Sequence, residues 1–179
     1  VHRLRARSCA ILTGINTVKH DDPELSVRHV QTTRQPLRVI LDNRLEIATN
    51  AKVLQKPGSL IFTTLQDNQK IDSLSEKGAQ VIVLPSPTGK LNLVEVMSTL
   101  AELEINELFV EAGSTLNGAL IESRLVDEII IYCAPIVLGN HAQSMLNLPE
   151  LASLSQKWQL EIKEIGKVGS DIKITTKLI

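Results

Sequence analysis

The sequence predicts an α/β fold: a mostly parallel central sheet flanked by helices, with an antiparallel hairpin at the C-terminal end. In the first two thirds of the chain, short runs rich in Ile, Val and Leu alternate with helix-type segments. Such runs are typical of parallel strands that are covered on both faces. Near the C-terminal end, apolar and polar residues alternate on both sides of a Gly-Ser pair, which is typical of a hairpin with one solvent-exposed face.

Five apolar runs are the predicted parallel strands: residues 9–13, 37–42, 59–63, 80–84 and 107–111. Two segments between them, 68–78 and 93–104, have the apolar spacing of amphipathic helices. Gly78 is the expected C-cap of the first helix, because glycine readily takes the left-handed conformation that ends many helices.

The last third of the chain changes character. Residues 128–138 are predicted to form one long apolar strand, and residues 158–165 and 171–178 are the two arms of the hairpin. We expect this hairpin to close one edge of the sheet or to make a subunit contact. No internal repeat or long linker divides the chain, so residues 1–179 are predicted to form a single domain.

The composition argues against several classes of function. The 19 basic and 20 acidic residues give a net charge of -1, so no general attraction to nucleic acid or an anionic membrane is expected. Aromatic residues make up only 2% of the chain, which leaves few for base stacking. No apolar run approaches the roughly 20 residues of a membrane span.

Three residues bear on the expected cellular location and on the extent of the chain: Cys9, Cys133 and Val1. Both cysteines lie in apolar runs, so they are predicted to be small buried residues in a reducing compartment. The chain shows no signal peptide, and the cytoplasm is the expected location. Because it opens on Val1 rather than Met, we expect it to be a fragment of a longer protein.

The region around residues 108–120 carries the most information about function. An apolar strand ends on Glu111, and Gly113 and Ser114 then lead into a predicted helix. Such a turn presents free backbone N–H groups and the positive end of a helix dipole, which favour an anion such as a pyrophosphate. Glu111 stands at the mouth of this turn, where a carboxylate can meet a substrate. The alternative is an ordinary helix start capped by Ser114 or Thr115.

A second turn of this kind lies near the beginning of the chain. The strand at 9–13 runs into Gly14 and a short helix that carries Thr17, which is again suited to a phosphate. The helix should end at Asp21-Asp22-Pro23, because proline disfavours helical geometry in the residue before it. The alternative is a basic, solvated helix face followed by an Asp-Pro helix stop.

A third site is predicted where the strand at 37–42 ends. An arginine after such a strand can hold the 2′-phosphate of NADP, where an acidic residue would hold the free hydroxyl of NAD. Asn43 and Arg44 therefore favour NADP. An Asx-type turn with an exposed arginine is equally compatible with the local sequence.

Several chemistries have no support in the sequence. It contains no P-loop, no Gly-x-Gly-x-x-Gly fingerprint and no serine framed as a hydrolase nucleophile. No spacing of Cys and His fits a zinc site, so no metal is expected.

Several short segments occur in the order found in one enzyme family. They are Leu4–Ser8 with Ala10–Leu12, Thr17-Val18, Asp21–Pro23 with Leu25 and Val27-Arg28, Gln35–Val39 with Leu41-Asp42, Val110–Leu116, Leu125–Glu128, Tyr132–Pro135 and Leu138-Gly139. In this order they resemble the reductase domain of bifunctional riboflavin-biosynthesis deaminase/reductases. The resemblance implies a dihydrofolate-reductase-like fold. It also implies NADPH-dependent reduction of 5-amino-6-(5-phosphoribosylamino)uracil, in which a hydride passes from the nicotinamide to C1 of the ribose.

The resemblance also implies roles for individual residues. The residues that match cofactor contacts of the family are Thr17, Asn43, Gly113, Ser114, Thr115, Leu116, Asn117, Gly118 and Ala119. Those that match substrate contacts are Arg5, Asp21, Arg28 and Glu111. Two arginines suit a sugar phosphate, and carboxylates suit ribose hydroxyls or the amino edge of the pyrimidine.

The chain departs from the family pattern in a few places. Asn43 stands where relatives often have Ser, and Ala112 stands where many have Gly. Family members also carry a first strand, a further Ser/Trp cofactor contact and a deaminase domain in the segment that precedes Val1 here. The chain is therefore expected to be the reductase domain of a longer protein, without that first strand.

Two other functions stay open on sequence alone. A related reductase of the same fold could act on a pteridine, which has no phosphate for Arg5 and Arg28 to hold. A non-catalytic assembly domain could instead use the sheet edge and the hairpin at 158–178, and it would show no saturable NADPH binding. For the leading function we expect a phosphorylated pyrimidine as the small-molecule partner, a homo-oligomer, and no nucleic-acid or membrane partner.

Overall fold

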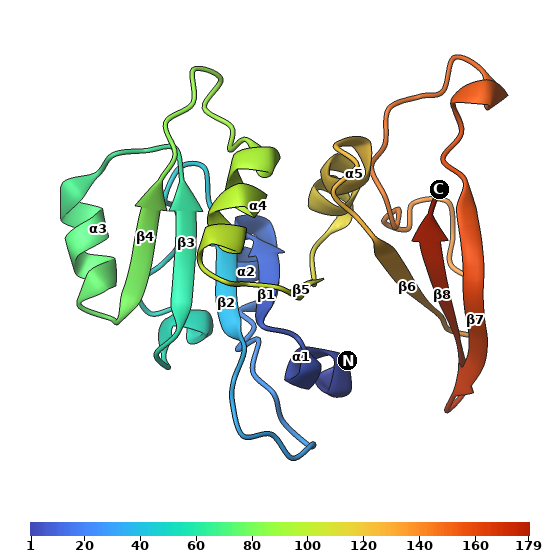
Figure 1. The fold of residues 1–179 in the computed structure, drawn as a ribbon, viewed down its shortest axis with the longest axis horizontal. Coiled ribbons are helices and arrows are strands. Elements are labelled where there is room, and N and C mark those ends of the chain that lie inside the picture. Colours follow the sequence, from blue (N-terminus) through green and yellow to red (C-terminus); the bar gives the residue numbers. More distant parts are fainter. The chain divides into compact units, whose positions relative to one another are not determined.

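Five short apolar strands form a parallel sheet in the first part of the chain. They are β1 (Ala10–Gly14), β2 (Leu37–Leu41), β3 (Ser59–Thr63), β4 (Ala79–Val83) and β5 (Leu108–Val110). The computed structural model describes residues 1–179, and its sheet has the strand order β4-β3-β2-β1-β5 (Figure 1). Every pairing in this sheet is parallel, as predicted, and each strand lies within one residue of its predicted ends.

The core of this sheet lies at its centre. All five residues of β3 are buried, and Ile40, Ile61 and Phe62 have no exposed surface. Ile47 and Leu74 pack onto the same cluster from outside the strands. Burying one such side chain stabilises the folded state by about 1.5–3 kcal/mol. Strands with continuous apolar runs, such as β2 and β3, are therefore most stable in the centre of the sheet, where both faces are covered.

Helices connect the strands. They are α1 (His2–Arg7), α2 (Ile15–Asp21), α3 (Asn68–Ser75), α4 (Leu93–Glu102) and α5 (Ser114–Glu122), with 3₁₀ turns η1 (Lys52–Leu54) and η2 (Leu154–Gln156). The Asp67 side chain caps α3 by accepting a hydrogen bond from the Lys70 amide, and Asn92 caps α4 in the same way through the Val94 amide. The expected C-cap at Gly78 is wrong by two residues. Glu76 is the C-cap of α3, and Gly78, at φ +77°, makes the turn beyond it.

The last part of the chain forms a separate antiparallel sheet. It consists of β6 (Glu128–Cys133), β7 (Leu160–Val168) and β8 (Asp171–Leu178), in the order β6-β8-β7. The predicted hairpin is present, and Gly169 takes a φ of +62° in its tight turn. It pairs with β6, so the expectation that it closes an edge of the parallel sheet is wrong.

Two further predictions for this part of the chain need correction. The strand predicted over 128–138 ends at Cys133, the last residue paired with β8, because Pro135 has no N–H group to continue the ladder. The prediction that both cysteines are buried is also wrong. Cys133 is exposed at the end of β6, and Cys9 is half-buried just before β1; both are free thiols.

The chain divides into two units, Val1–Leu116 and Asn117–Ile179. The division falls within α5, and the single reductase domain stays a prediction. None of the helices has the length and apolar character required to cross a bilayer.

Arg38 is a buried cation in β2 without a carboxylate partner. Only 3% of its surface is exposed, and its guanidinium donates to the carbonyl oxygens of Lys56, Pro57 and Gly58. Burial lowers the pKa of this side chain. Arg38 therefore closes the loop that leads into β3.

We expect Arg38→Ala to lower the free energy of unfolding by about 1.5–3 kcal/mol, because three carbonyls lose a charged donor. Lys90→Ala, at an exposed position, should change it by less than about 0.5 kcal/mol. Chemical denaturation of both variants measures the difference. Equal unfolding midpoints for the two variants would contradict the role given to Arg38.

Candidate functional site

The predicted site residues gather where the parallel strands end. The segments that follow β1, β2 and β5 carry Thr17, Asn43 and Gly113, and the carboxyl ends of parallel strands share one edge of a sheet. The turns after β1 and β5 are neighbours: a Cβ atom placed on Gly14 would lie 3.6 Å from Cδ2 of Leu116. Two strand–glycine–helix turns therefore lie side by side in the first unit.

The turn after β5 is open toward solvent. Gly113 is exposed, and a Cβ atom built on it would meet nothing within 4 Å. The helix α5 begins at Ser114, so Ser114 and Thr115 lie in its first turn and not in front of it. The turn leaves room for a ligand to approach the backbone, and such a helix start favours an anion.

The other predicted cofactor residues of α5 lie in the second unit. They are Asn117, Gly118 and Ala119. Gly118 is buried, and a Cβ atom there would lie 2.0 Å from the carbonyl oxygen of Asn147. Gly118 therefore permits a close approach of two backbone segments within that unit.

Asn43 joins the ends of three strands. Its side-chain oxygen accepts a hydrogen bond of 2.9 Å from the Leu91 amide, in the segment after β4. Its carbonyl oxygen accepts hydrogen bonds from the hydroxyls of Thr63 and Thr64, at the end of β3. The side chain of Asn43 therefore holds the segment after β4 and does not close its own turn, and the neighbouring Arg44 is exposed.

Asp42 builds the turn that presents Asn43 and Arg44. Its carboxylate is fully buried, and Oδ2 accepts a hydrogen bond of 2.8 Å from the Ile47 amide. The Asp42 carbonyl accepts another from the Leu45 amide, while Oδ1 has no partner. The sequence placed Asp42 at the end of a predicted strand and in the family match, but its role in holding the turn was not predicted.

The strongest polar contact of the site joins Arg5 and Glu111. Arg5 Nε lies 2.6 Å from Glu111 Oε1 and Nη2 lies 2.8 Å from Oε2, which is a side-on bidentate pair. Arg5 Nη1 donates to the carbonyl oxygen of Ser26 at 2.9 Å. The side chains of Arg5 and Glu111 are 11% and 22% exposed, so the pair is largely shielded from water. Thr13 fixes the Glu111 backbone by donating to its carbonyl oxygen at 2.7 Å.

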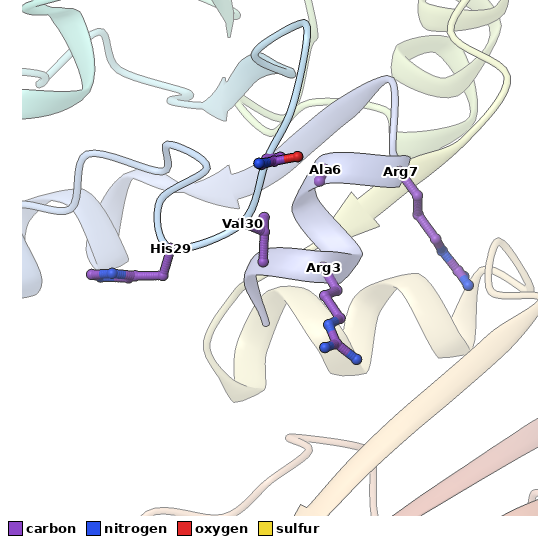
Figure 2. Close-up of a pocket in the computed structure, with 6 residues that line it drawn as sticks. Arg3, Ala6, Arg7, His29 and Val30 are labelled. Atoms are coloured by element: carbon purple, nitrogen blue, oxygen red, sulfur yellow. The ribbon is translucent and has the colours of Figure 1, made fainter.

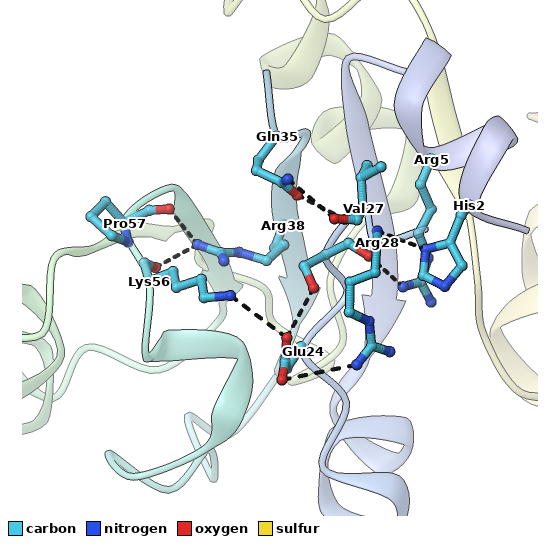
Figure 3. Close-up of polar contacts among 10 residues, drawn as sticks. His2, Arg5, Glu24, Val27, Arg28, Gln35, Arg38, Lys56 and Pro57 are labelled. Carbon is cyan, nitrogen blue, oxygen red and sulfur yellow. Dashed lines mark hydrogen bonds and ion pairs between the residues drawn. The ribbon is translucent and has the colours of Figure 1, made fainter. Parts of the chain in front are cut away.

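Arg28 lies on a folded-back segment beside this pair. The Val27 amide donates to Gln35 Oε1 at 2.7 Å, and Gln35 Nε2 returns a hydrogen bond to the Val27 carbonyl (Figure 3). The Arg28 amide donates to Nδ1 of His2, on α1, at 3.0 Å. Burial and the nearby charge of Arg5 lower the pKa of His2, which favours the neutral ring that can accept this hydrogen bond.

The guanidinium of Arg28 itself is loosely held. Its side chain is 52% exposed, and its nearest carboxylate oxygen, on Glu24, lies 4.0 Å away. Glu24 also accepts a hydrogen bond from Ser26 and faces Lys56 at 3.7 Å; these contacts lower the pKa of Glu24. Arg28 is therefore available to an anionic ligand to a degree that Arg5 is not.

The structure brings some of the predicted substrate residues together and leaves one apart. Arg5, Glu111 and the Arg28 segment are linked through Ser26 and His2. Asp21 is the exposed last residue of α2 and has no such link. The sequence did not predict that His2, Thr13 and Gln35 hold the backbone of the site by hydrogen bonds. Only Thr13 offered a signal, because a buried hydroxyl in an apolar strand requires a hydrogen-bond partner.

A hollow of about 650 Å³ lies on the first unit between α1 and the segment that follows Arg28. Arg3, Ala6 and Arg7 of α1 line it together with His29, Val30 and Gln31 (Figure 2). None of these residues is a predicted site residue. The carboxyl edge of the sheet, with its paired carboxylate and open glycine turn, is the better candidate for chemistry.

Comparisons with known proteins give matches along nearly the whole chain. A riboflavin biosynthesis protein RibD of Escherichia coli is 37% identical over 184 residues, which cover 96% of this chain and 49% of that protein. A Buchnera aphidicola protein named 5-amino-6-(5-phosphoribosylamino)uracil reductase is 31% identical over 186 residues, covering 97% of this chain and 88% of that protein. A solved structure of Acinetobacter baumannii RibD has a TM-score of 0.87 at 29% identity, over 99% of this chain and 49% of that one.

The chain spans about half the length of the RibD proteins it matches. The family model described as the RibD C-terminal domain matches residues 1–174. The order of the predicted motifs, the parallel sheet and this match agree along nearly the whole sequence, and the chain therefore belongs to the RibD C-terminal domain family.

Proposed function

We propose that this chain is the reductase domain of a longer riboflavin-biosynthesis protein. In this proposal it reduces 5-amino-6-(5-phosphoribosylamino)uracil to its ribitylamino product with NADPH. Residues 1–179 form the single domain that carries out this reaction. Its family and the name of the Buchnera relative support the reaction. The observation that carries the proposal is the anchored Glu111 carboxylate, two residues before the open turn at Gly113.

The residues at the carboxyl edge fit a dinucleotide cofactor. The backbone of Gly113, Ser114 and Thr115 would hold the pyrophosphate, and the exposed Arg44 would hold the 2′-phosphate. Thr17, half-buried on α2, would contact the cofactor beside the neighbouring turn. The bound nicotinamide would supply the hydride, while the protein binds and orients the two reactants.

The substrate would lie against Glu111 and Arg28. Arg28 has an exposed guanidinium that suits the sugar phosphate. Glu111 keeps unused acceptor positions on both carboxylate oxygens, which suit ribose hydroxyls or the amino edge of the pyrimidine. Asp21 and Arg5 complete the set of residues that the family assigns to the substrate.

Arg44→Ala in the full-length enzyme should weaken NADPH binding about tenfold or more and leave NADH binding nearly unchanged. The reason is that a hydrogen bond to a charged group contributes about 1.5–3 kcal/mol. Fluorescence titration with both cofactors measures the change. Equal affinity of the unmutated enzyme for NADPH and NADH would contradict this assignment.

Gly113→Val should abolish NADPH binding while the protein stays folded. The added side chain meets no protein atom at its Cβ, so it fills only the space through which the cofactor would approach. Titrations beside thermal melts separate the two effects. If the variant loses stability but retains its NADPH affinity, the turn is only a helix start.

Arg28→Ala should raise KM for the phosphorylated substrate about tenfold or more, because the phosphate loses a charged donor. It should leave a dephosphorylated analogue nearly unaffected, and NADPH affinity should not move. Lys56→Ala is the matched control, because Lys56 is the other cation that faces Glu24. Equal losses with both substrates would show that Arg28 does not hold the phosphate.

A further inference from the structure

We propose that Asp42 is a positioning residue that sets the preference for NADPH over NADH, acting through the backbone of the turn that carries Arg44. Asp42 has this role only if Arg44 holds the 2′-phosphate, so the proposal rests on the proposed function. Asp42 itself is fully buried and cannot contact the cofactor. Its influence therefore has to pass through residues 42–47, the turn that follows β2.

Exposed and buried residues alternate along this turn. Arg44 and Glu46 are exposed, whereas Leu45 is 4% exposed and Ile47 is fully buried in the apolar cluster of the sheet. The two buried side chains fix the path of the backbone on the C-terminal side of Arg44. The direction in which the Arg44 side chain leaves the protein surface therefore depends on the conformation of this short segment.

Leu45 has a backbone conformation that requires support. Its φ of +55° lies in the left-handed region, which residues other than glycine seldom occupy. A residue of this kind persists only where the surrounding structure holds it in place. Burial of the Leu45 side chain is one source of support, and hydrogen bonds to the neighbouring amides are the other.

Asp42 makes two hydrogen bonds to the second half of the turn. Its carbonyl oxygen accepts one from the Leu45 amide at 3.1 Å, and Oδ2 accepts one from the Ile47 amide at 2.8 Å. Any residue at position 42 can make the first bond, because it uses the main chain. The second bond needs a side-chain acceptor. The side chain of Asp42 therefore closes the turn at Ile47.

The other polar contacts of the turn do not replace this closure. Asn43 bonds to the segments after β3 and β4, and these contacts hold only the start of the turn. Glu46 forms an ion pair with Lys19 at 3.0 Å, but the two side chains are 40% and 50% exposed. Exposed ion pairs stabilise a structure only slightly and are screened by salt.

The two cofactors distinguish positioning from stability. NADPH and NADH differ only in the 2′-phosphate, so a change in the orientation of Arg44 affects the binding of NADPH alone. A binding group that is already oriented loses less conformational entropy when the ligand arrives. Removing the side chain of Asp42 should therefore weaken NADPH binding selectively, whereas a general loss of stability should affect both cofactors.

Arg38 provides a matched control in the same strand. It lies near the start of β2, is also buried, and donates to the carbonyl oxygens of residues 56–58, while Asp42 follows the end of β2. Arg38→Ala removes buried hydrogen bonds of this strand without touching the turn at 42–47. It should lower the stability of the protein and change neither cofactor affinity by more than about twofold.

The test compares the affinities of the full-length enzyme for NADPH and NADH, measured by fluorescence titration. We expect Asp42→Ala to weaken NADPH binding about fivefold or more and NADH binding less than about twofold. Asp42→Asn keeps an oxygen that can accept from the Ile47 amide, so its NADPH affinity should stay within about threefold of the unmutated value. Adding Asp42→Ala to Arg44→Ala should weaken NADPH binding by less than about a further twofold.

Three outcomes of the titrations would overturn the proposal. If Asp42→Ala weakens NADPH and NADH binding equally, Asp42 only stabilises the fold. If the losses of Asp42→Ala and Arg44→Ala multiply in the double variant, Asp42 does not act through Arg44. If Asp42→Asn loses as much NADPH affinity as Asp42→Ala, the hydrogen bond to Ile47 does not position the turn.

Hydrogen exchange of the Ile47 amide tests the same link in the unmutated enzyme, whether or not Asp42→Ala folds. We expect this amide to be protected before any cofactor is added, because Asp42 already accepts its hydrogen bond. Rapid exchange in the cofactor-free enzyme would overturn the proposal. Equal affinity for NADPH and NADH would instead contradict the proposed cofactor, while the exchange of this amide would still decide whether Asp42 closes the turn.

Discussion

Burial of the parallel strands restricts chemistry to the residues that follow them. The strands β1, β2 and β3 have almost no exposed surface, so no side chain within them can meet a ligand. Two of these strands nevertheless carry a threonine at or next to the last position. Thr13 and Thr63 are fully buried hydroxyls, and each donates to the backbone of the segment after a neighbouring strand. The buried strands thus hold the turns that a ligand would touch.

These hydrogen bonds run across the carboxyl edge of the sheet from strand to strand. Thr13 links β1 to Glu111, and Thr63 links β3 to Asn43. Asn43 in turn reaches Leu91, in the segment after β4. Buried polar groups rarely go without partners, because desolvation without a hydrogen bond is costly. The edge therefore carries two sets of polar links, one that joins β1 to the segment after β5 and one that joins the segments after β2, β3 and β4.

The strands of the sheet were predictable because local sequence determines them. Continuous Ile, Val and Leu runs predict buried parallel strands, and alternation at the end of the chain predicts the hairpin. The strand predicted over 128–138 was too long because apolar content continues past Pro135, whereas the hydrogen-bond ladder does not. The hairpin belongs to a separate sheet because β8 pairs with β6. A pairing between two such distant segments cannot be predicted from the local sequence of either one.

The candidate site was predictable in its residues but not in their contacts. Arg5 and Glu111 were both expected at a substrate, yet their pairing joins a helix at one end of the first unit to a turn 106 residues later. No spacing in the sequence encodes such a contact. The exposure of Arg28 and the pairing of Arg5 likewise depend on tertiary neighbours.

The helix α1 belongs to the candidate site but is not needed for the sheet. The sheet begins at Ala10, so a chain trimmed to that residue would keep all five parallel strands and their buried core. It would, however, lose the cation that pairs with Glu111 and the ring that accepts a hydrogen bond from the Arg28 amide. The sheet and the candidate site therefore require different lengths of chain, and the stability of a truncated form would not report the loss of these contacts.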